Sequence, residues 1–361
     1  MGYDFLIVGA GLFGSVFARE ATDRGYKCLV IDKRNHIGGN CYTEKKEGIH
    51  VHMYGPHIFH TSSKKIWDYV NKFSEFEQYQ HNVIANYNDS IYNLPFNMNT
   101  FYQMFHTCNK QEILEIIEQT RFKGDPQNLE EYALSIVGEH IYYKLIYGYT
   151  KKQWGKEPKE LPKSIIARLP LRFTFNNNYF NDLYQGIPTE GYTKFFENLL
   201  DNIEVELEVD FFAKRSYYEH MSKKIVYTGP IDRYYDYCYG KLDYRSLVFE
   251  HSKLDQEIYQ GCAQMNFTDT YTPYTRIIEH KLFLSKQNTP QTIITKEFPA
   301  TYTLTKEPYY PVNNKINNNV ANKYKQILNK KDVFGGRLAE YRYYDMHQVV
   351  ASSLKCSEGV L

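Results

Sequence analysis

Apolar and polar positions alternate in blocks at the start of the chain. Residues 5–8 and 28–31 are continuously apolar, as is typical of strands buried on both faces of a parallel sheet. Residues 12–24 between them have the apolar spacing of a helix, and Gly25 follows as its cap. This strand–helix–strand order predicts a Rossmann-like α/β domain.

Three later regions have other patterns of apolar and polar residues. Residues 83–94 carry two short apolar runs around a polar turn and predict a β-hairpin. Residues 97–149 become helical, with Asn128 as the N-cap of a helix whose apolar positions recur every three or four residues. Residues 244–310 are rich in Thr, Tyr, Ile and Val and predict an antiparallel sheet.

Several other segments complete the prediction. We expect helices at 64–73, 193–200 and 345–354, and strands at 203–211, 224–227 and 333–334. We expect irregular or exposed chain at 158–170, 173–182 and 313–319, where proline or asparagine is frequent.

Candidate chemistry first appears in the turn after the first strand. Gly9, Gly11 and Gly14 have the spacing G-x-G-x-x-G. The first glycine permits a tight turn, the second lets a pyrophosphate approach the backbone, and the third lets helix and strand pack closely. The helix N-terminus at Leu12 and Phe13 offers N–H groups to phosphates, and a carboxylate after the second strand, here Asp32, can bond a ribose hydroxyl. These features predict a dinucleotide site.

A second glycine pair favours FAD over NAD. The pair is Gly38 and Gly39, which follow Lys33 closely and precede Asn40. Small residues there would let the backbone approach the middle of a longer cofactor. Near the end of the chain, Gly336 and Arg337 occupy a strand-to-turn segment. A helix N-terminus then follows, which could bind a phosphate or a flavin oxygen.

A turn at residues 57–60 carries two closely spaced histidines, His57 and His60. Such a pair could bind a metal, but no carboxylate or cysteine cluster accompanies it in the sequence, so we expect no metal. We expect instead that this turn contacts the flavin or the substrate.

The fold class is therefore α/β, with a Rossmann-like FAD-binding domain, a helical insert and an antiparallel-sheet substrate domain. We expect the FAD-binding domain to be discontinuous, so that the other two form a cleft against it. The boundaries are 1–80 with 190–240 and 320–361 for the FAD-binding domain, 97–155 for the helical domain, and 81–96, 156–189 and 241–319 for the sheet domain.

Composition excludes several classes of partner. The formal net charge of +1 gives no basic field, so we expect no nucleic-acid partner. No apolar run approaches about 18 residues, so we expect no membrane span. The start of the chain does not have the pattern of a signal peptide, and the 6 cysteines lack C-x-x-C pairs, which favours reduced thiols in the cytoplasm. The 35 tyrosines suit sugar and nucleotide pockets.

Six motifs occur in order along the chain. They are G-A-G-L-F-G at 9–14, K-R-N-H-I-G-G-N at 33–40, G-P-H-I-F-H-T at 55–61, G-Y-T with Q-W-G at 148–155, P-Y-T-R with E-H at 273–280, and G-R-L with Y-R-Y-Y-D-M at 336–346. The first motif is common to many flavoproteins. Together, over essentially the whole chain, the set resembles the bacterial UDP-galactopyranose mutase family.

The resemblance implies a homodimeric, cytoplasmic FAD enzyme, an isomerase that is active only when its flavin is reduced. It implies interconversion of UDP-galactopyranose and UDP-galactofuranose for cell-surface polysaccharide. This ring contraction has no net redox change and proceeds through a covalent adduct between flavin N5 and the sugar.

The resemblance also implies roles for single residues. Arg168 and Arg276 match the arginines that clamp the substrate pyrophosphate, and His60 matches a histidine near the flavin; these three are the catalytic candidates. The segment at about 154–182 matches a mobile lid. The candidate substrate-binding residues are His81, Thr150, Trp154, Arg168, Tyr179 (under the uracil), Asn266, Arg276, Glu297, Tyr310 and Tyr343. The candidate FAD-binding residues are Gly9, Gly11, Leu12, Phe13, Gly14, Asp32, Lys33, Gly39, Asn40, His57, Ile58, Gly336, Arg337, Asp345 and Met346.

Two departures from the family pattern leave the sugar open. His81 stands where relatives carry Asn, and Ala167 stands where relatives carry Lys. The same chemistry could act on UDP-N-acetylgalactosamine or on a dTDP-6-deoxy sugar. Functions of a different class also stay open, namely an FAD oxidoreductase of the amine-oxidase type, a flavin- or nucleotide-sugar-binding protein without activity, and an NAD-dependent dehydrogenase.

Overall fold

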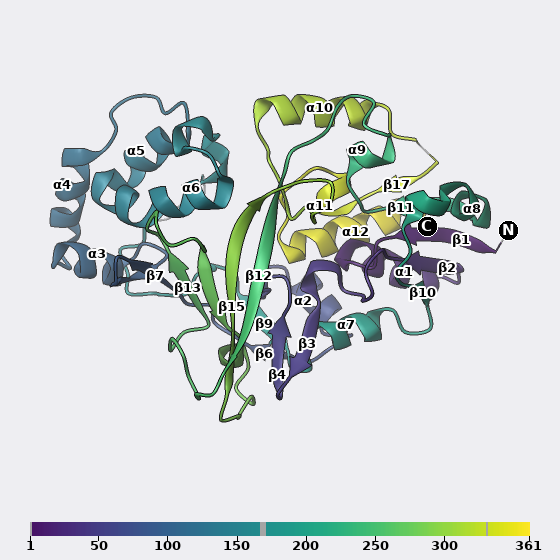
Figure 1. The fold of residues 1–361 in the computed structure, drawn as a ribbon, viewed down its shortest axis with the longest axis horizontal. Helices are drawn as coiled ribbons and strands as arrows, with labels where there is room; N and C mark the ends of the chain where they lie inside the picture. Colours follow the sequence, from purple (N-terminus) through teal and green to yellow (C-terminus); the bar gives the residue numbers. More distant parts are fainter. Residues whose placement is uncertain (1, 167–170, 330) are drawn as a thin grey trace.

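Five parallel strands form the sheet predicted for the dinucleotide-binding domain. The computed structural model describes residues 2–166, 171–329 and 331–361. The strand order is β10 (Glu204–Glu206), β2 (Cys28–Ile31), β1 (Tyr3–Val8), β11 (Ser222–Tyr227) and β17 (Val333–Phe334). Segments from the start, middle and end of the chain therefore meet in one sheet (Figure 1).

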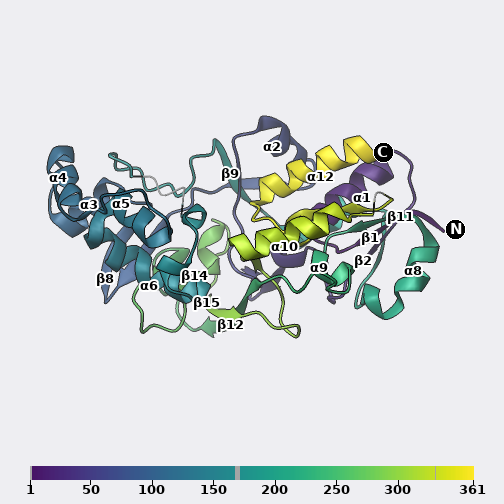
Figure 2. The ribbon, with the colours of Figure 1, turned by 90° about the horizontal axis from the view of Figure 1, so that it is seen from above.

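Both faces of this sheet are covered, which explains the unbroken apolar runs. Phe5 and Ile7 of β1 pack into one core cluster, and Leu6 between them packs into another on the opposite face. On the first face, α12 (Met346–Val360) lies along α1 (Leu12–Asp23), as Figure 2 shows, and the Ser353 hydroxyl donates to the Phe13 carbonyl at 2.8 Å. The helices near the other face are α8 (Arg215–Met221) and α9 (Ile231–Tyr234).

A larger sheet stands beside the Rossmann domain, in the centre of Figure 1. Its pairs are antiparallel except for β13 with β7, which run parallel. The order is β16 (Tyr310–Pro311), β12 (Tyr244–Leu254), β15 (Thr292–Thr301), β14 (Arg276–Glu279), β13 (Gln264–Phe267), β7 (Val83–Tyr87) and β8 (Ser90–Leu94). The predicted hairpin at 83–94 is confirmed and forms one edge.

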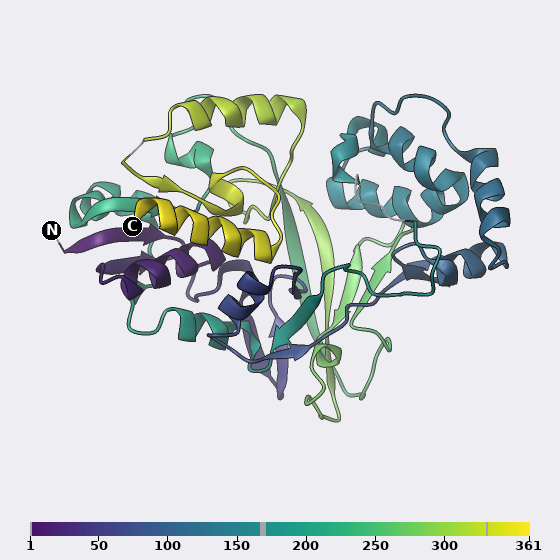
Figure 3. The same cartoon turned by 180° about the vertical axis from the view of Figure 1, so that it is seen from behind.

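Two small sheets complete the β-structure. One has the order β5 (Phe59–Thr61), β9 (Tyr184–Pro188) and β6 (Phe76–Gln78), and it is fully antiparallel. The other pairs β3 (Thr43–Lys46) with β4 (Ile49–His52). The view from behind shows β6 and β9 side by side, where the chain runs out to the helical region and returns from it (Figure 3). The helices α2 (Lys64–Val70) and α7 (Gly191–Leu199) belong to the same region.

The predicted helical insert is confirmed. It contains α3 (Met98–Phe105), α4 (Lys110–Thr120), α5 (Leu129–Ile141), a π-helical turn at Tyr142–Tyr147 and α6 (Gly148–Trp154), on the left of Figure 1. Asn128 is the N-cap of α5 and accepts from the Glu131 N–H at 3.0 Å. Val137 and Ile141 share a core cluster with Val83 of the hairpin, which joins the insert to the large sheet.

A half-buried lysine, Lys152, fixes α6 against the turn that precedes the Arg276 strand. The Lys152 ammonium donates to the carbonyls of Phe267, Thr272 and Tyr274 at 2.9, 3.0 and 3.2 Å. Burial lowers the pKa of Lys152 to about 8. Gly148 allows the contact, because a Cβ there would lie 2.3 Å from the Thr268 carbonyl oxygen.

Replacing this lysine should destabilise the protein. We expect Lys152→Met to lower the free energy of unfolding by about 2 kcal/mol, because it leaves three carbonyls without their donor. Lys151→Met is the matched control, since Lys151 makes a more exposed ion pair with Glu157, and its effect should be much smaller. Urea unfolding measures both variants; equal effects would contradict the role given to Lys152.

Two predictions of local structure are wrong. The predicted strand at 203–211 is reduced to β10, because Glu208 adopts a φ of 58° and the chain leaves the sheet edge. The Glu208 and Val209 N–H groups then donate to the carbonyls of Arg34 and Asp32, both at 2.9 Å, which turns the segment over the end of β2.

The second correction concerns the asparagine-rich stretch at 313–319, which is not simply exposed chain. It contains the start of α10 (Lys315–Gln326), with Asn314 as N-cap accepting from the Asn317 N–H at 2.8 Å. Asn317 is buried and donates to Asp243 and to the Val312 carbonyl at 3.1 and 2.9 Å. We propose that the three-domain division holds, with α10 as the link between the large sheet and the last segment of the Rossmann domain.

Candidate active site

A cavity of about 250 Å³ lies where the parallel strands β1, β2 and β11 end. The strand order reverses at β1, and this is the place where doubly wound sheets bind ligands. Most of the candidate cofactor residues line the cavity, namely Gly9, Gly11, Leu12, Phe13, Asp32, Lys33, Gly39, Asn40, His57, Gly336, Arg337 and Met346.

The glycines that line this cavity allow backbone segments to approach each other closely, because they carry no Cβ. Gly9 has a φ of 115°, and a Cβ there would lie 2.0 Å from the Thr228 hydroxyl oxygen. A Cβ on Gly14 would lie 2.1 Å from the Gly9 carbonyl oxygen, so the close helix–strand packing is confirmed. A Cβ on Gly39 would lie 3.0 Å from the Gly11 Cα, so the two glycine motifs face each other. Because Gly11 also begins α1 without a side-chain cap, backbone approach by a pyrophosphate fits this cradle.

The Asp32 carboxylate holds the glycine turn in addition to facing the cavity. Its two oxygens accept from the backbone N–H groups of Ala10 at 2.8 Å and Arg34 at 2.9 Å. A carboxylate oxygen has more than one acceptor site, so a ribose hydroxyl could still be bound.

The sequence did not indicate the residues that close the cavity from the other side. Glu307 pairs with Lys33 at 2.6 Å and with Arg34 at 3.1 Å, and the Arg34 guanidinium lies 4.5 Å from the centre of the Tyr54 ring. Glu307 lies between β15 and β16 of the large sheet, far from Lys33 and Arg34 in sequence, so only the tertiary structure brings it here. The turn at 228–230 after β11 also lines the cavity.

A polar row crosses the large sheet beside this cavity. Strand register places Asn266 opposite Arg276 and Arg276 opposite Glu297. The Arg276 guanidinium lies 2.8 Å from a Glu297 carboxylate oxygen, and Glu297 is fully buried. Burial alone would lower the pKa of Arg276, but Glu297 and the nearby Tyr149 and Tyr310 outweigh it and hold this pKa well above its usual value.

Tyrosines surround Arg276 and connect it to the cofactor cavity. The Tyr310 and Tyr343 rings stack with their centres 5.7 Å apart, and the Arg337 guanidinium lies 5.5 Å from the centre of each. Arg276 acts electrostatically on Tyr149, Tyr179 and Tyr310, so all three lie near it. Because Arg337 also lines the cavity, the tyrosines around Arg276 lie next to the cofactor cavity. Tyr149 was not predicted, although the G-Y-T motif contains it.

The segment before β9 lies over two histidines of the site. The Tyr179 N–H donates to the His81 carbonyl at 2.7 Å. The Phe180 ring stacks on His60 with centres 3.8 Å apart and also on His81 at 5.7 Å. Burial, and then the charge of Arg276, lowers the pKa of His81 to about 3, so this side chain is neutral and offers hydrogen bonds rather than charge.

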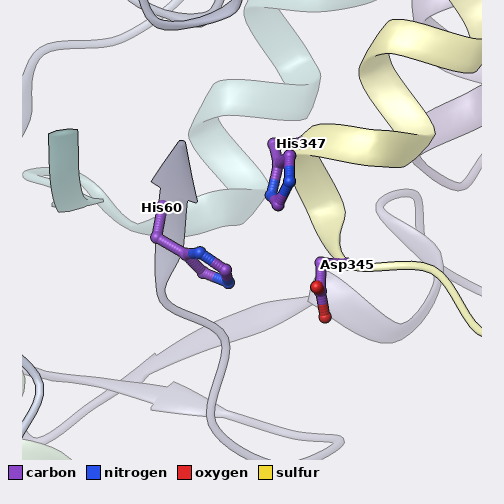
Figure 4. Close-up of side chains that lie close together, drawn as sticks. All are labelled: His60, Asp345 and His347. Carbon is purple, nitrogen blue, oxygen red and sulfur yellow. The ribbon is translucent and has the colours of Figure 1, made fainter. Parts of the chain in front are cut away.

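His60, Asp345 and His347 come together, as Figure 4 shows. Each offers one nitrogen or oxygen, and these atoms lie within 4.8 Å of one another. No sequence pattern indicated this group, because its carboxylate comes from the far end of the chain. Asp345 and His347 take part in further interactions, and Asp345 also begins α12 with a capping box. The expectation that no metal binds therefore stays a prediction.

A buried histidine network lies behind His57. The backbone N–H of His57 donates to His52 Nδ1 at 3.1 Å, and the backbone N–H of His52 donates to His280 Nδ1 at 3.2 Å. His280 Nδ1 is thus an acceptor, so its Nε2 carries the proton and donates to the Thr295 hydroxyl at 2.6 Å. His251 Nδ1 contacts the same hydroxyl at 2.7 Å. This network holds the His57 turn against the large sheet.

The remaining candidates are more loosely connected to the site. Ile58 is buried in a core cluster. Thr150 is buried on α6, and Trp154 is the half-buried last residue of that helix. Arg168, and Ala167 beside it, lie outside the described residues.

Comparison with known proteins identifies the class. Residues 7–73 match the model of an NAD(P)-binding Rossmann-like domain, and residues 144–343 match a family model described as UDP-galactopyranose mutase. The chain is 41% identical to a dTDP-fucopyranose mutase of Escherichia coli, over 98% of this chain and 97% of that protein. It is also 41% identical to a probable UDP-galactopyranose mutase of Klebsiella pneumoniae, over 99% of this chain and 94% of that protein.

The fold agrees with these sequence matches. A crystal structure of reduced UDP-galactopyranose mutase superimposes with a TM-score of 0.79 over 100% of this chain and 94% of that one, at 16% identity. The fold is that of a Rossmann-type protein with a dinucleotide-binding domain, and the sequence matches place it among isomerases. The chain belongs to the UDP-galactopyranose mutase family. Among the described residues, no helix combines the length and apolar character needed to cross a membrane.

Proposed function

We propose that this protein is a flavin-dependent mutase that interconverts the pyranose and furanose forms of a UDP-linked hexose, with UDP-galactose as the first candidate. The observation that carries the proposal is Arg276, a half-buried cation paired with the buried Glu297 and surrounded by tyrosines, next to the cofactor cavity. A guanidinium of this kind suits a diphosphate, which takes paired, charge-assisted hydrogen bonds.

FAD is the cofactor that we propose for the cavity. The facing glycines Gly11 and Gly39 leave room for a pyrophosphate, and Arg337 and Met346 extend the cavity toward the tyrosine pocket, as a cofactor longer than NAD requires. Asp32 would bond the ribose. When bound and reduced, the flavin supplies a nucleophilic nitrogen for the sugar, and the overall reaction transfers no electrons.

The side chains of this protein would then bind and orient the nucleotide sugar. Arg276, with Arg168 as its predicted partner, would neutralise the diphosphate as it leaves the sugar. Burial raises the pKa of Tyr310, so its hydroxyl stays protonated and can donate to a phosphate oxygen. Tyr179 is 42% exposed and offers a ring face to the base, beside Asn266 and His81. His60 is the candidate that would hold or move a proton next to the flavin.

The identity of the sugar is a separate question, because the two bacterial relatives are equally similar and differ in their substrates. A dTDP-6-deoxy sugar is therefore the second candidate, supported by the 41% identity to the dTDP-fucopyranose mutase. UDP-N-acetylgalactosamine is the third. A homodimer, a cytoplasmic location and a role in cell-surface polysaccharide remain predictions from the family.

Turnover of all three nucleotide sugars tests the proposal. We expect the yellow protein, reduced with dithionite, to convert UDP-galactopyranose to its furanose form, with the products separated by chromatography. Faster conversion of dTDP-fucopyranose would reassign the sugar and keep the mutase reaction. No furanose from any of the three would refute the proposal, and an oxidised sugar would point to an oxidoreductase.

A further inference from the structure

His60 is held from two directions by one short segment of chain. Its Nδ1 lies 2.6 Å from an Asp182 carboxylate oxygen, and the Phe180 ring stacks on it at an interplanar angle of 10°. Asp182 lies just before β9, whose residues pair with β5, the strand that carries His60. The sequence prediction included neither Phe180 nor Asp182 in the site.

The Asp182 carboxylate is itself fixed. Its second oxygen accepts from the Ser62 hydroxyl at 2.6 Å, and the Gln185 side-chain amide donates to its backbone carbonyl at 3.0 Å. Burial would raise the pKa of Asp182, but the hydrogen bonds from Ser62 and His60 outweigh it and lower this pKa. An ionised carboxylate only accepts hydrogen bonds, so the His60 nitrogen beside it must carry a proton.

The consequence for His60 is chemical as well as geometric. With Nδ1 occupied by Asp182, Nε2 is the nitrogen available to the site, and the ring points toward Asp345 and His347 (Figure 4). The neutral imidazole then has its lone pair on Nε2, and the imidazolium has a proton to give there. Either form acts toward the site through Nε2.

From these contacts we infer that Asp182 is a positioning residue, which keeps the proton of His60 on Nδ1 and so presents Nε2 to the reacting sugar and cofactor. This role rests on the proposed mutase function. The same segment carries Tyr179, the candidate platform for the base. One stretch of chain, residues 179–182, therefore both places Tyr179 for the base and orients His60.

The first test is the protonation state of His60, which requires neither turnover nor a variant of Asp182. In the flavin-bound protein labelled with ¹⁵N-histidine at pH 8, we expect long-range ¹H–¹⁵N correlations to show a protonated Nδ1. The signals are assigned by their loss in His60→Gln. An unprotonated Nδ1 in the unmodified protein would overturn the inference, whether or not the protein is a mutase.

The second test uses Asp182→Asn, in which the amide can donate to Nδ1 as well as accept from it. We expect part of the His60 population to move its proton to Nε2. We also expect kcat to fall about 10-fold or more, with KM for the nucleotide sugar changed less than about 3-fold. Asp68→Asn is the matched control, because it neutralises an exposed carboxylate paired with Lys64 on α2 and should change neither readout.

A double variant separates action through His60 from a general structural effect. In the His60→Gln background, Asp182→Asn should cause no further loss of kcat, because the group that it positions is already absent. An equal loss in both backgrounds, or an unchanged His60 tautomer in Asp182→Asn, would overturn the inference. Absence of mutase activity in the unmodified protein would refute the proposed function. The measured protonation of His60 Nδ1 would still test whether Asp182 fixes the tautomer.

Discussion

Replacing Arg276 by alanine should abolish most turnover and also destabilise the fold. We expect kcat/KM to fall at least about 100-fold, because the variant lacks the cation that would stabilise the charge of the leaving diphosphate. We expect the free energy of unfolding to fall by about 3 kcal/mol or more, because Glu297 then remains in the core without its 2.8 Å partner. Steady-state kinetics and urea unfolding measure the two effects.

A second substitution separates the two effects. Arg276→Ala combined with Glu297→Gln removes the unpaired charge, so stability should recover in part and turnover should not. Flavin absorbance confirms that the cofactor is still bound, since Arg276 is not among the residues that line the cofactor cavity. Recovery of turnover together with stability would show that Arg276 has only a structural role.

The buried histidines should make the protein lose stability in mild acid. Burial is the first cause of the low pKa values, about 3 for His280 and about 4 for His57, and the pKa of His52 also lies well below its usual value of 6.5. Below pH 6.5 the unfolded chain therefore binds more protons than the folded protein. The stabilisation is complete above pH 6.5 and is lost as the pH falls toward 4 and 3, by about 2 kcal/mol per histidine between pH 7 and pH 5.

The measurement is the free energy of unfolding in urea at a series of pH values. His280→Gln should reduce the slope of this free energy against pH by about 1.4 kcal/mol per pH unit below pH 6, because one such histidine fewer takes up a proton on unfolding. The slope is the informative quantity, since the substitution also alters the hydrogen bonds to His52 and Thr295. A slope equal to that of the unmodified protein would contradict the assignment of His280 as a neutral buried group.

Local sequence signals were sufficient for the Rossmann core and for the main helix of the insert. The apolar runs of β1 and β2, the three glycines and the N-cap Asn128 each depend on residues close together in sequence, and the structure confirms the elements that they predict. The two errors occur where tertiary contacts decide the outcome. Glu208 leaves the sheet to bond Arg34, and the asparagine-rich segment becomes helical because Asn317 finds buried partners.

The candidate site was predictable where a motif carries the residue itself. The cofactor glycines, Arg276 and Arg337 belong to this group, and the structure brings them to adjacent parts of the site. Glu307, Tyr149 and Asp182 were missed because their importance lies in the partner each one meets. Glu307 meets Arg34, Tyr149 meets Arg276, and Asp182 meets His60. In each case the two residues belong to different segments of the chain. Periodicity in one sequence does not specify such pairs.

The position of β1 also sets the order in which the molecule can be completed during synthesis. This strand lies between β2, which the ribosome makes soon after it, and β11, which arrives much later. Gly336, Arg337 and Met346, which close the cofactor cavity, come later still, as does α12, which covers α1. A nascent chain has the glycine turn but not the cavity, and it exposes apolar faces of β1 and α1 while translation continues. Cofactor loading is therefore a step that follows translation of nearly the whole chain.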